Sequence, residues 1–147
     1  MKKFLWAVLF FAFIFFLTAC QNQSSMAQQE LTINNQKLIV EVAKTMAEQA
    51  QGLSGRQKLC DNCGLLFEFP DYKVRNFHMK DMNFALDIIW IKDNQIVGFE
   101  ENVPVLTTDG QFSQVKSNTP VNRVLEVKAG WVRENGVEVG EVIDGLD

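Results

Sequence analysis

Two cysteines separated by two residues are the first group in this sequence that could carry chemistry. Cys60 and Cys63 flank Asp61 and Asn62, a spacing that suits a local disulfide, a redox-active dithiol or half of a metal site. The pair leads into a predicted strand, whereas redox-active cysteines are usually activated at a helix N-terminus. We therefore favour a structural disulfide, worth about 2 kcal/mol because its loop is so short. Free thiols, redox activity and metal binding remain open alternatives.

The single histidine of the chain, His78, precedes two charged residues, Lys80 and Asp81. Together with Cys60 and Cys63, His78 and Asp81 would supply four possible zinc ligands. Strand alternation instead puts His78 and Lys80 on the same strand face, which favours a partly exposed histidine beside a lysine. We predict no metal site and no cofactor.

Asp87 lies inside an apolar segment that reads as a strand buried on both faces. An unpaired buried charge is costly, so this carboxylate needs partners. Arg56, Arg75 and Lys80 are the candidate cations for an internal ion pair, and capping of backbone N–H groups is the other structural interpretation. A functional interpretation puts the carboxylate on the floor of a polar pocket together with Arg56, Lys80 and Glu126.

Known catalytic motifs are missing from the sequence. It contains no Gly-x-Ser-x-Gly, no His-Glu-x-x-His and no phosphate-binding glycine loop. We therefore prefer a non-enzymatic binding or accessory module over two alternatives. One is a thiol-redox or metal-handling protein that uses Cys60 and Cys63, and the other is an enzyme of unknown class.

The N-terminus predicts export and lipidation. Lys2 and Lys3 precede an uncharged apolar run over residues 4–17, which is too short to span a bilayer and typical of a signal peptide. Leu17-Thr18-Ala19-Cys20 resembles a bacterial lipobox, in which the cysteine is lipidated and becomes the mature N-terminus. We predict three parts: a signal peptide (1–19), a lipidated Cys20 with a flexible tether (20–30), and one β-rich domain (31–147).

The charge of the chain bears on its partners. The net charge is −4, and removal of Lys2 and Lys3 leaves 12 basic against 18 acidic residues, or −6. This balance disfavours nucleic acid as a partner. We expect a monomer that its lipid holds at the membrane, facing the periplasm or the exterior, with an unknown protein or small-molecule partner. Gln21 favours the outer membrane if the host has one.

The elements that must position these residues are mostly short strands. Alternation and turn residues predict strands over residues 31–33, 37–43, 64–69, 76–80, 86–91, 95–101, 121–128 and 141–143. Thr45 and Glu48 form a capping-box pattern for a helix over 46–51 that ends at Gly52, and a second short helix is predicted over 130–135. Both helices are too short for a crossover between parallel strands, which predicts that none is present. The expected fold class is mainly β, a compact antiparallel sandwich or barrel-like domain with one or two short helices.

An ordered set of short motifs resembles the family known as domain of unknown function 192, over roughly residues 31–144. The motifs are Gly52-Leu53-x-x-Arg56, Gly64-Leu65-Leu66-Phe67-x-Phe69, Met79-Lys80, Leu86-Asp87-Ile88, Val124-Leu125-Glu126-Val127-x-Ala129-Gly130 and Gly136-Val137-x-x-Gly140. The resemblance implies a small, compact, mostly β domain. It implies no catalytic residue, because the family has no settled activity.

The chain departs from the family pattern at three positions. It has His78 where the family usually has Trp, Asp81 where it has Asn, and Ala85 where it has Pro. If that Trp lines a binding surface in the family, His78 changes the surface here.

Overall fold

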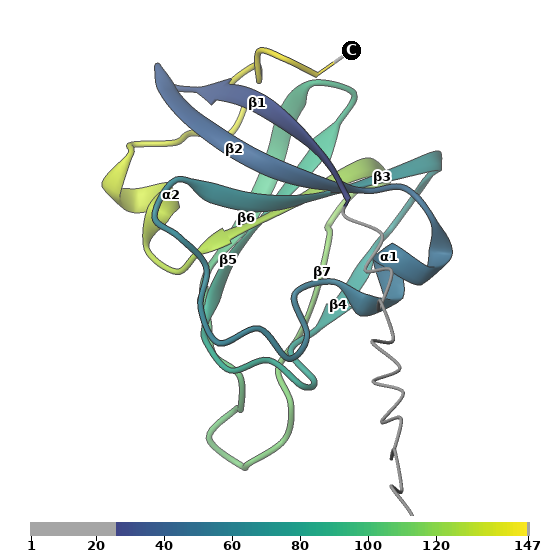
Figure 1. Ribbon diagram of the computed structural model, residues 1–147, viewed down its shortest axis with the longest axis vertical. Helices are drawn as coiled ribbons and strands as arrows, with labels where there is room; N and C mark the ends of the chain where they lie inside the picture. The colour runs from purple at the N-terminus through teal and green to yellow at the C-terminus, as the bar shows by residue number, and fades with distance from the viewer. Residues whose placement is uncertain (1–25, 147) are drawn as a thin grey trace, which may run out of the picture.

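The computed structural model describes residues 26–146 and contains ten elements of secondary structure (Figure 1). The strands are β1 (Ala27–Ile33), β2 (Gln36–Ala43), β3 (Cys63–Lys73), β4 (Asn76–His78), β5 (Leu86–Lys92), β6 (Gln95–Val103), β7 (Gln114–Lys116) and β8 (Val121–Lys128). The helices are α1 (Met46–Gln51) and α2 (Trp131–Glu134). The predicted mainly β fold class is confirmed. Neither of these helices is long and apolar enough to cross a membrane.

Six strands form one mixed sheet in the order β1-β2-β3-β8-β5-β6. Its neighbouring strands are antiparallel except for β2 and β3, which pair in parallel from Ile39–Cys63 to Ala43–Phe67. α1 and the loop after it carry the chain back to the start of β3, so the prediction that no helix serves a parallel crossover is wrong here. The loop supplies the length that a six-residue helix lacks. The large sheet is not closed into a barrel.

The chain enters the sheet through a hairpin whose turn is Asn34-Asn35. Both residues have positive φ, 46° and 63°, as a two-residue hairpin turn requires. β1 starts at Ala27, which pairs with Val42. Residues 27–30, predicted as part of the tether, therefore belong to the sheet, while the signal peptide and Cys20 lie outside the described residues.

Each face of the large sheet carries its own apolar core. α2 covers one face, where Leu66, Ile89 and Leu125 pack with Trp131 and Val132. On the other face, Leu65, Ile88 and Trp90 belong to a second core that also includes Met79 and Met82.

The second core is covered by a small sheet of β4 and β7, which lies below the large sheet in Figure 1. β4 ends at His78, two residues before its predicted end, because Asp81 has a positive φ of 61° in the turn that follows. β7 was not predicted. Its partner β4 lies far away in sequence, paired through Phe77–Val115.

The C-terminal segment, residues 140–145, bonds to both edge strands of the large sheet. Ile96 N donates to Glu141 O at 2.9 Å next to β6, and Thr32 N of β1 donates to Asp144 O at 3.0 Å. A Cβ on Gly145 would lie 2.5 Å from Glu30 O, so this close approach requires glycine. The predicted strand over 141–143 is present only as isolated bridges.

Candidate functional site

A cavity of about 210 Å³ lies between α1 and β4, on the face of the large sheet that the small sheet covers. Its apolar wall includes Leu53, Phe67, Phe69, Phe77 and Met82, and its polar lining includes Gln49, Asn76, His78 and Glu126. A mostly apolar cavity with a few polar groups is typical of a small-molecule site. This volume suits a small ligand or a single side chain.

The sheet register positions Glu126 beneath this cavity. Glu126 lies on β8, near the middle of the sheet, directly opposite Leu65 of β3 and Ile88 of β5. Directly opposed residues share a face, so this carboxylate projects between two buried aliphatic side chains. Val124, two residues earlier on the same strand face, is also buried. A carboxylate therefore stands at a position where the core is otherwise apolar.

The Glu126 carboxyl is buried and incompletely satisfied. The residue is 7% exposed, and its Oε2 atom has no hydrogen-bond partner among the described residues. Burial raises the pKa of Glu126 to about 8, against a partial opposing effect of the Arg56 charge. The side chain is therefore mostly protonated at neutral pH. An unsatisfied buried polar group of this kind requires an explanation.

Aromatic rings line the same cavity as this carboxyl. Phe77 meets Phe67 edge-to-face with centroids 4.9 Å apart, and its contact with Trp90 is also edge-to-face at 5.8 Å. Such pairs hold their rings in fixed orientations. The guanidinium of Arg75 lies 3.8 Å from the centroid of the Phe69 ring, so one face of that ring already contacts a cation.

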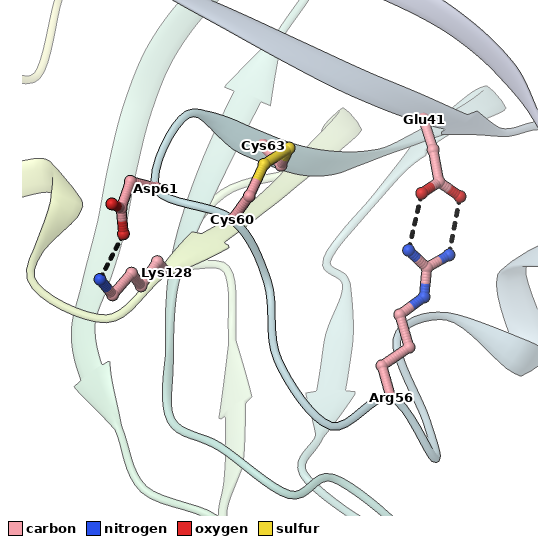
Figure 2. Close-up of a disulfide and its surroundings, with 6 residues drawn as sticks. All are labelled: Glu41, Arg56, Cys60, Asp61, Cys63 and Lys128. Carbon is pink, nitrogen blue, oxygen red and sulfur yellow. Dashed lines mark hydrogen bonds and ion pairs between the residues drawn. A yellow bond between two sulfur atoms is a disulfide. The ribbon is translucent and has the colours of Figure 1, made fainter.

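Arg56 lies in the loop after α1 and binds Glu41 rather than Asp87. Its guanidinium donates two parallel hydrogen bonds to the Glu41 carboxylate, at 2.6 and 2.7 Å (Figure 2). This bidentate bond lowers the pKa of Glu41 and raises the pKa of Arg56. Because Glu41 lies opposite Leu65, the pair sits on the same sheet face as Glu126.

Asp87 lies on the opposite face of the sheet from Glu126, because its neighbour Ile88 is the residue opposite Glu126. Asp87 is 0% exposed. Its Oδ1 accepts from the backbone N–H groups of Asn102 (2.7 Å) and Gly130 (3.0 Å). Its Oδ2 accepts from Val132 N, at the start of α2, at 2.9 Å. Of the two structural interpretations, the ion pair with Arg56, Arg75 or Lys80 is wrong, and capping of backbone N–H groups is the one observed.

Lys80 and Asp81 are exposed in the turn after β4. Asp81 contributes through its backbone, since its carbonyl accepts from Gly55 N at 2.9 Å. Asn83 Nδ2 donates to Arg56 O at 2.9 Å. These bonds tie the turn after β4 to the loop after α1. The predicted polar site is thus divided: His78 and Glu126 share the cavity, Arg56 lies beside it, and Asp87 is on the other face.

Cys60 and Cys63 form a disulfide at the start of β3, with their Cα atoms 5.1 Å apart (Figure 2). Between them, Asp61 pairs with Lys128 of β8, an ion pair that lowers the pKa of Asp61. Within residues 26–146, no group of three His, Cys, Asp or Glu side chains could hold a metal ion. Cys60, Cys63, His78 and Asp81 therefore do not come together as the four ligands of a zinc site.

The aromatic wall of the cavity was not predicted from the sequence. Phe67 and Phe69 alternate along one strand face, and this spacing was the available signal. Their meeting with Phe77 depends on the pairing of β4 with β7, to which the local sequence gives no guide.

Comparisons with known proteins agree on a family and give no activity. Residues 29–145 match the family DUF192, described as Uncharacterized ACR, which confirms the family resemblance. No curated protein matches the chain. A Sinorhizobium meliloti crystal structure, provisionally described as that of a transcription regulator, is similar with TM-score 0.73 and 30% identity over 82% of this chain and 95% of that one. A Novosphingobium aromaticivorans protein of unknown function has TM-score 0.68 and 24% identity, over 81% and 84% of the two chains.

Proposed function

We propose a binding function for this chain, which belongs to the DUF192 family. In this proposal the protein is a lipid-anchored, non-enzymatic module of the cell envelope, facing the periplasm or the exterior. Its ligand enters the cavity between α1 and β4. The observation that carries the proposal is the buried Glu126 carboxyl, whose Oε2 has no partner among the described residues and which lines an aromatic-walled cavity.

The energetic cost of Glu126 supports a ligand-binding role for this carboxyl. A leucine or isoleucine would match its neighbours Leu65 and Ile88 and would add apolar contacts instead of an unsatisfied polar atom. A ligand that satisfies Oε2 would recover part of that cost. Perturbed, buried titratable groups in a cavity are typical of functional sites.

The proposed anchor would hold this cavity close to the membrane. Met26, the first described residue, lines a second hollow together with Thr45, Glu48 and Arg56. Gly52 lines both this hollow and the Glu126 cavity, so the chain enters the domain on the cavity side. Six peptide units separate Cys20 from Met26, which limits the distance between them to roughly 20 Å.

A ligand-observed NMR screen of small fragments tests the proposal with two tryptophan variants of α1. Ala50 is exposed and lines the cavity, so Ala50→Trp should obstruct it. Met46 lies on the same helix, is 87% exposed and is not part of the cavity lining, so Met46→Trp is the matched control.

We expect fragments that bind the wild-type protein and Met46→Trp but lose binding to Ala50→Trp. A screen in which no fragment discriminates between the two variants would overturn the binding proposal. Thermal melts of both variants would establish that each is folded before the comparison is made.

A further inference from the structure

We infer that the ligand of the Glu126 cavity carries an ammonium group, which pairs with the Glu126 carboxylate against the rings of Phe67 and Phe77. The inference rests on the proposed binding function and names its ligand class. It starts from the charges of the lining: Glu126 and His78 are the titratable side chains among the lining residues described, and none of these residues is lysine or arginine.

Arg56, the basic side chain whose charge acts on Glu126, is bound to another carboxylate. Arg56 holds Glu41 with both of its terminal nitrogens, and no hydrogen bond joins it to Glu126 in the part of the chain that the structure describes. An anionic ligand would therefore meet a carboxyl group and no lysine or arginine among the lining residues described. A cationic ligand would supply the charge that an ionised Glu126 lacks.

The wall of the cavity also favours a cation. The face of an aromatic ring attracts an ammonium group, and the attraction is strongest where water is excluded. Phe69 already contacts the Arg75 guanidinium on one face. Phe67 and Phe77, fixed at right angles to each other, provide further ring surface in the same cavity lining as Glu126.

Binding of such a cation would release a proton. In the free protein the buried Glu126 is mostly protonated at pH 7, because its pKa is raised to about 8. An ammonium ligand binds the carboxylate, so the acid proton leaves to the solvent as the ion pair forms. The other charged or titratable groups on the elements around the cavity are the Arg56–Glu41 pair, on the α1 loop and β2, His78 on β4, and Arg75, whose guanidinium lies against the lining ring of Phe69.

Choline and 3,3-dimethyl-1-butanol are suitable probes, because they share one shape and differ in charge. Isothermal titration calorimetry of the full chain in maltoside detergent would compare them. We expect choline to bind at least about tenfold more tightly than the alcohol, with about 0.9 protons released at pH 7 for a group of pKa about 8. Proton release is measured by repeating the titration in buffers of different ionisation enthalpy.

The pH dependence separates Glu126 from the ligand, because choline has no titratable proton near neutrality. Its affinity should rise about tenfold from pH 7 to pH 9 as Glu126 ionises. Glu126→Gln should remove the pH dependence, the proton release and most of the preference for choline. Met46→Trp, a change outside the cavity lining, should retain all three.

Each outcome bears on the inference separately from the binding function. Equal or tighter binding of the alcohol, lost in Ala50→Trp, would leave the cavity as a binding site and overturn the ammonium assignment. Absence of choline binding would overturn it whatever the fragment screen finds. Glycerophosphocholine tests where the ammonium group of the natural ligand comes from. Tighter binding than choline indicates a lipid headgroup, and weaker binding indicates a free ammonium compound.

Discussion

Replacement of Asp87 by alanine should be among the most destabilising single changes in this domain. The carboxylate accepts three backbone hydrogen bonds, from Asn102, Gly130 and Val132. Hydrogen bonds to a charged group contribute about 1.5–3 kcal/mol each. Water entering the vacated space would recover part of the sum, so we expect a net loss of about 3–5 kcal/mol. Such domains are stable by only roughly 5–15 kcal/mol in total.

Urea denaturation followed by tryptophan fluorescence is a suitable assay, since Trp90 and Trp131 are both buried. Trp131 lies on α2, and Asp87 accepts a hydrogen bond from Val132 N in the first turn of that helix. Asp87→Asn keeps the size and one acceptor oxygen but faces a backbone N–H with an amide donor. The free energy of unfolding of Asp87→Asn should be lower by about 1.5–3 kcal/mol. This smaller loss makes it the variant to measure if Asp87→Ala fails to fold.

A double-mutant cycle with Arg56→Ala tests the assignment of partners. Asp87 and Arg56 act on opposite faces of the sheet, so their effects should add to within about 0.5 kcal/mol. An Asp87→Ala loss below about 1 kcal/mol would refute the capping role. A coupling energy above about 1 kcal/mol would instead indicate that Asp87 and Arg56 form an ion pair.

Three further predictions concern the cavity, the disulfide and the anchor. Glu126 has an ordinary pKa of 4.5 and a folded-state pKa of about 8, so the native protein keeps a proton that the unfolded chain releases between these values. The free energy of unfolding should thus fall by about 1.4 kcal/mol per pH unit over that range. Urea melts of Glu126→Gln from pH 5 to 8 should lack this slope. Equal slopes in the wild-type protein and the variant would contradict the burial of Glu126 as a protonated acid. Changing Cys60 and Cys63 to serine together should cost about 2 kcal/mol in the same assay, and a loss above about 4 kcal/mol would contradict a purely local role. Cys20→Ala should move the protein from washed membranes to the soluble fraction, and retention in the membrane pellet after a high-salt wash would count against lipidation.

Features encoded by neighbouring residues could be predicted from the sequence. The Asn34-Asn35 turn falls between the strands predicted over residues 31–33 and 37–43, and asparagine tolerates the positive φ that both positions adopt. The capping box of α1 is also complete: Thr45 Oγ1 accepts from Glu48 N, and the Glu48 carboxylate accepts from Thr45 N. Each of these features depends on groups within a few residues of one another.

Features that depend on distant parts of the chain could not be predicted. The parallel pairing of β2 with β3 is set by where the loop after α1 returns, and β7 is a strand only because β4 lies beside it. The same limit applies to the polar residues. A buried carboxylate such as Asp87 must have partners, and backbone capping was one of the two expected arrangements. Which N–H groups do the capping could not be predicted, because another strand and α2 supply them.

The attachment of residues 140–145 to β1 and β6 restricts how this domain can meet other proteins. Edge strands normally present unpaired backbone groups, which can recruit a strand of another molecule or start aggregation. Here one segment occupies backbone groups at both edges, through Thr32 on β1 and Ile96 on β6. Recognition by β-augmentation is thereby disfavoured at both places, and side-chain surfaces, including the mouth of the cavity, are left as the means of contact.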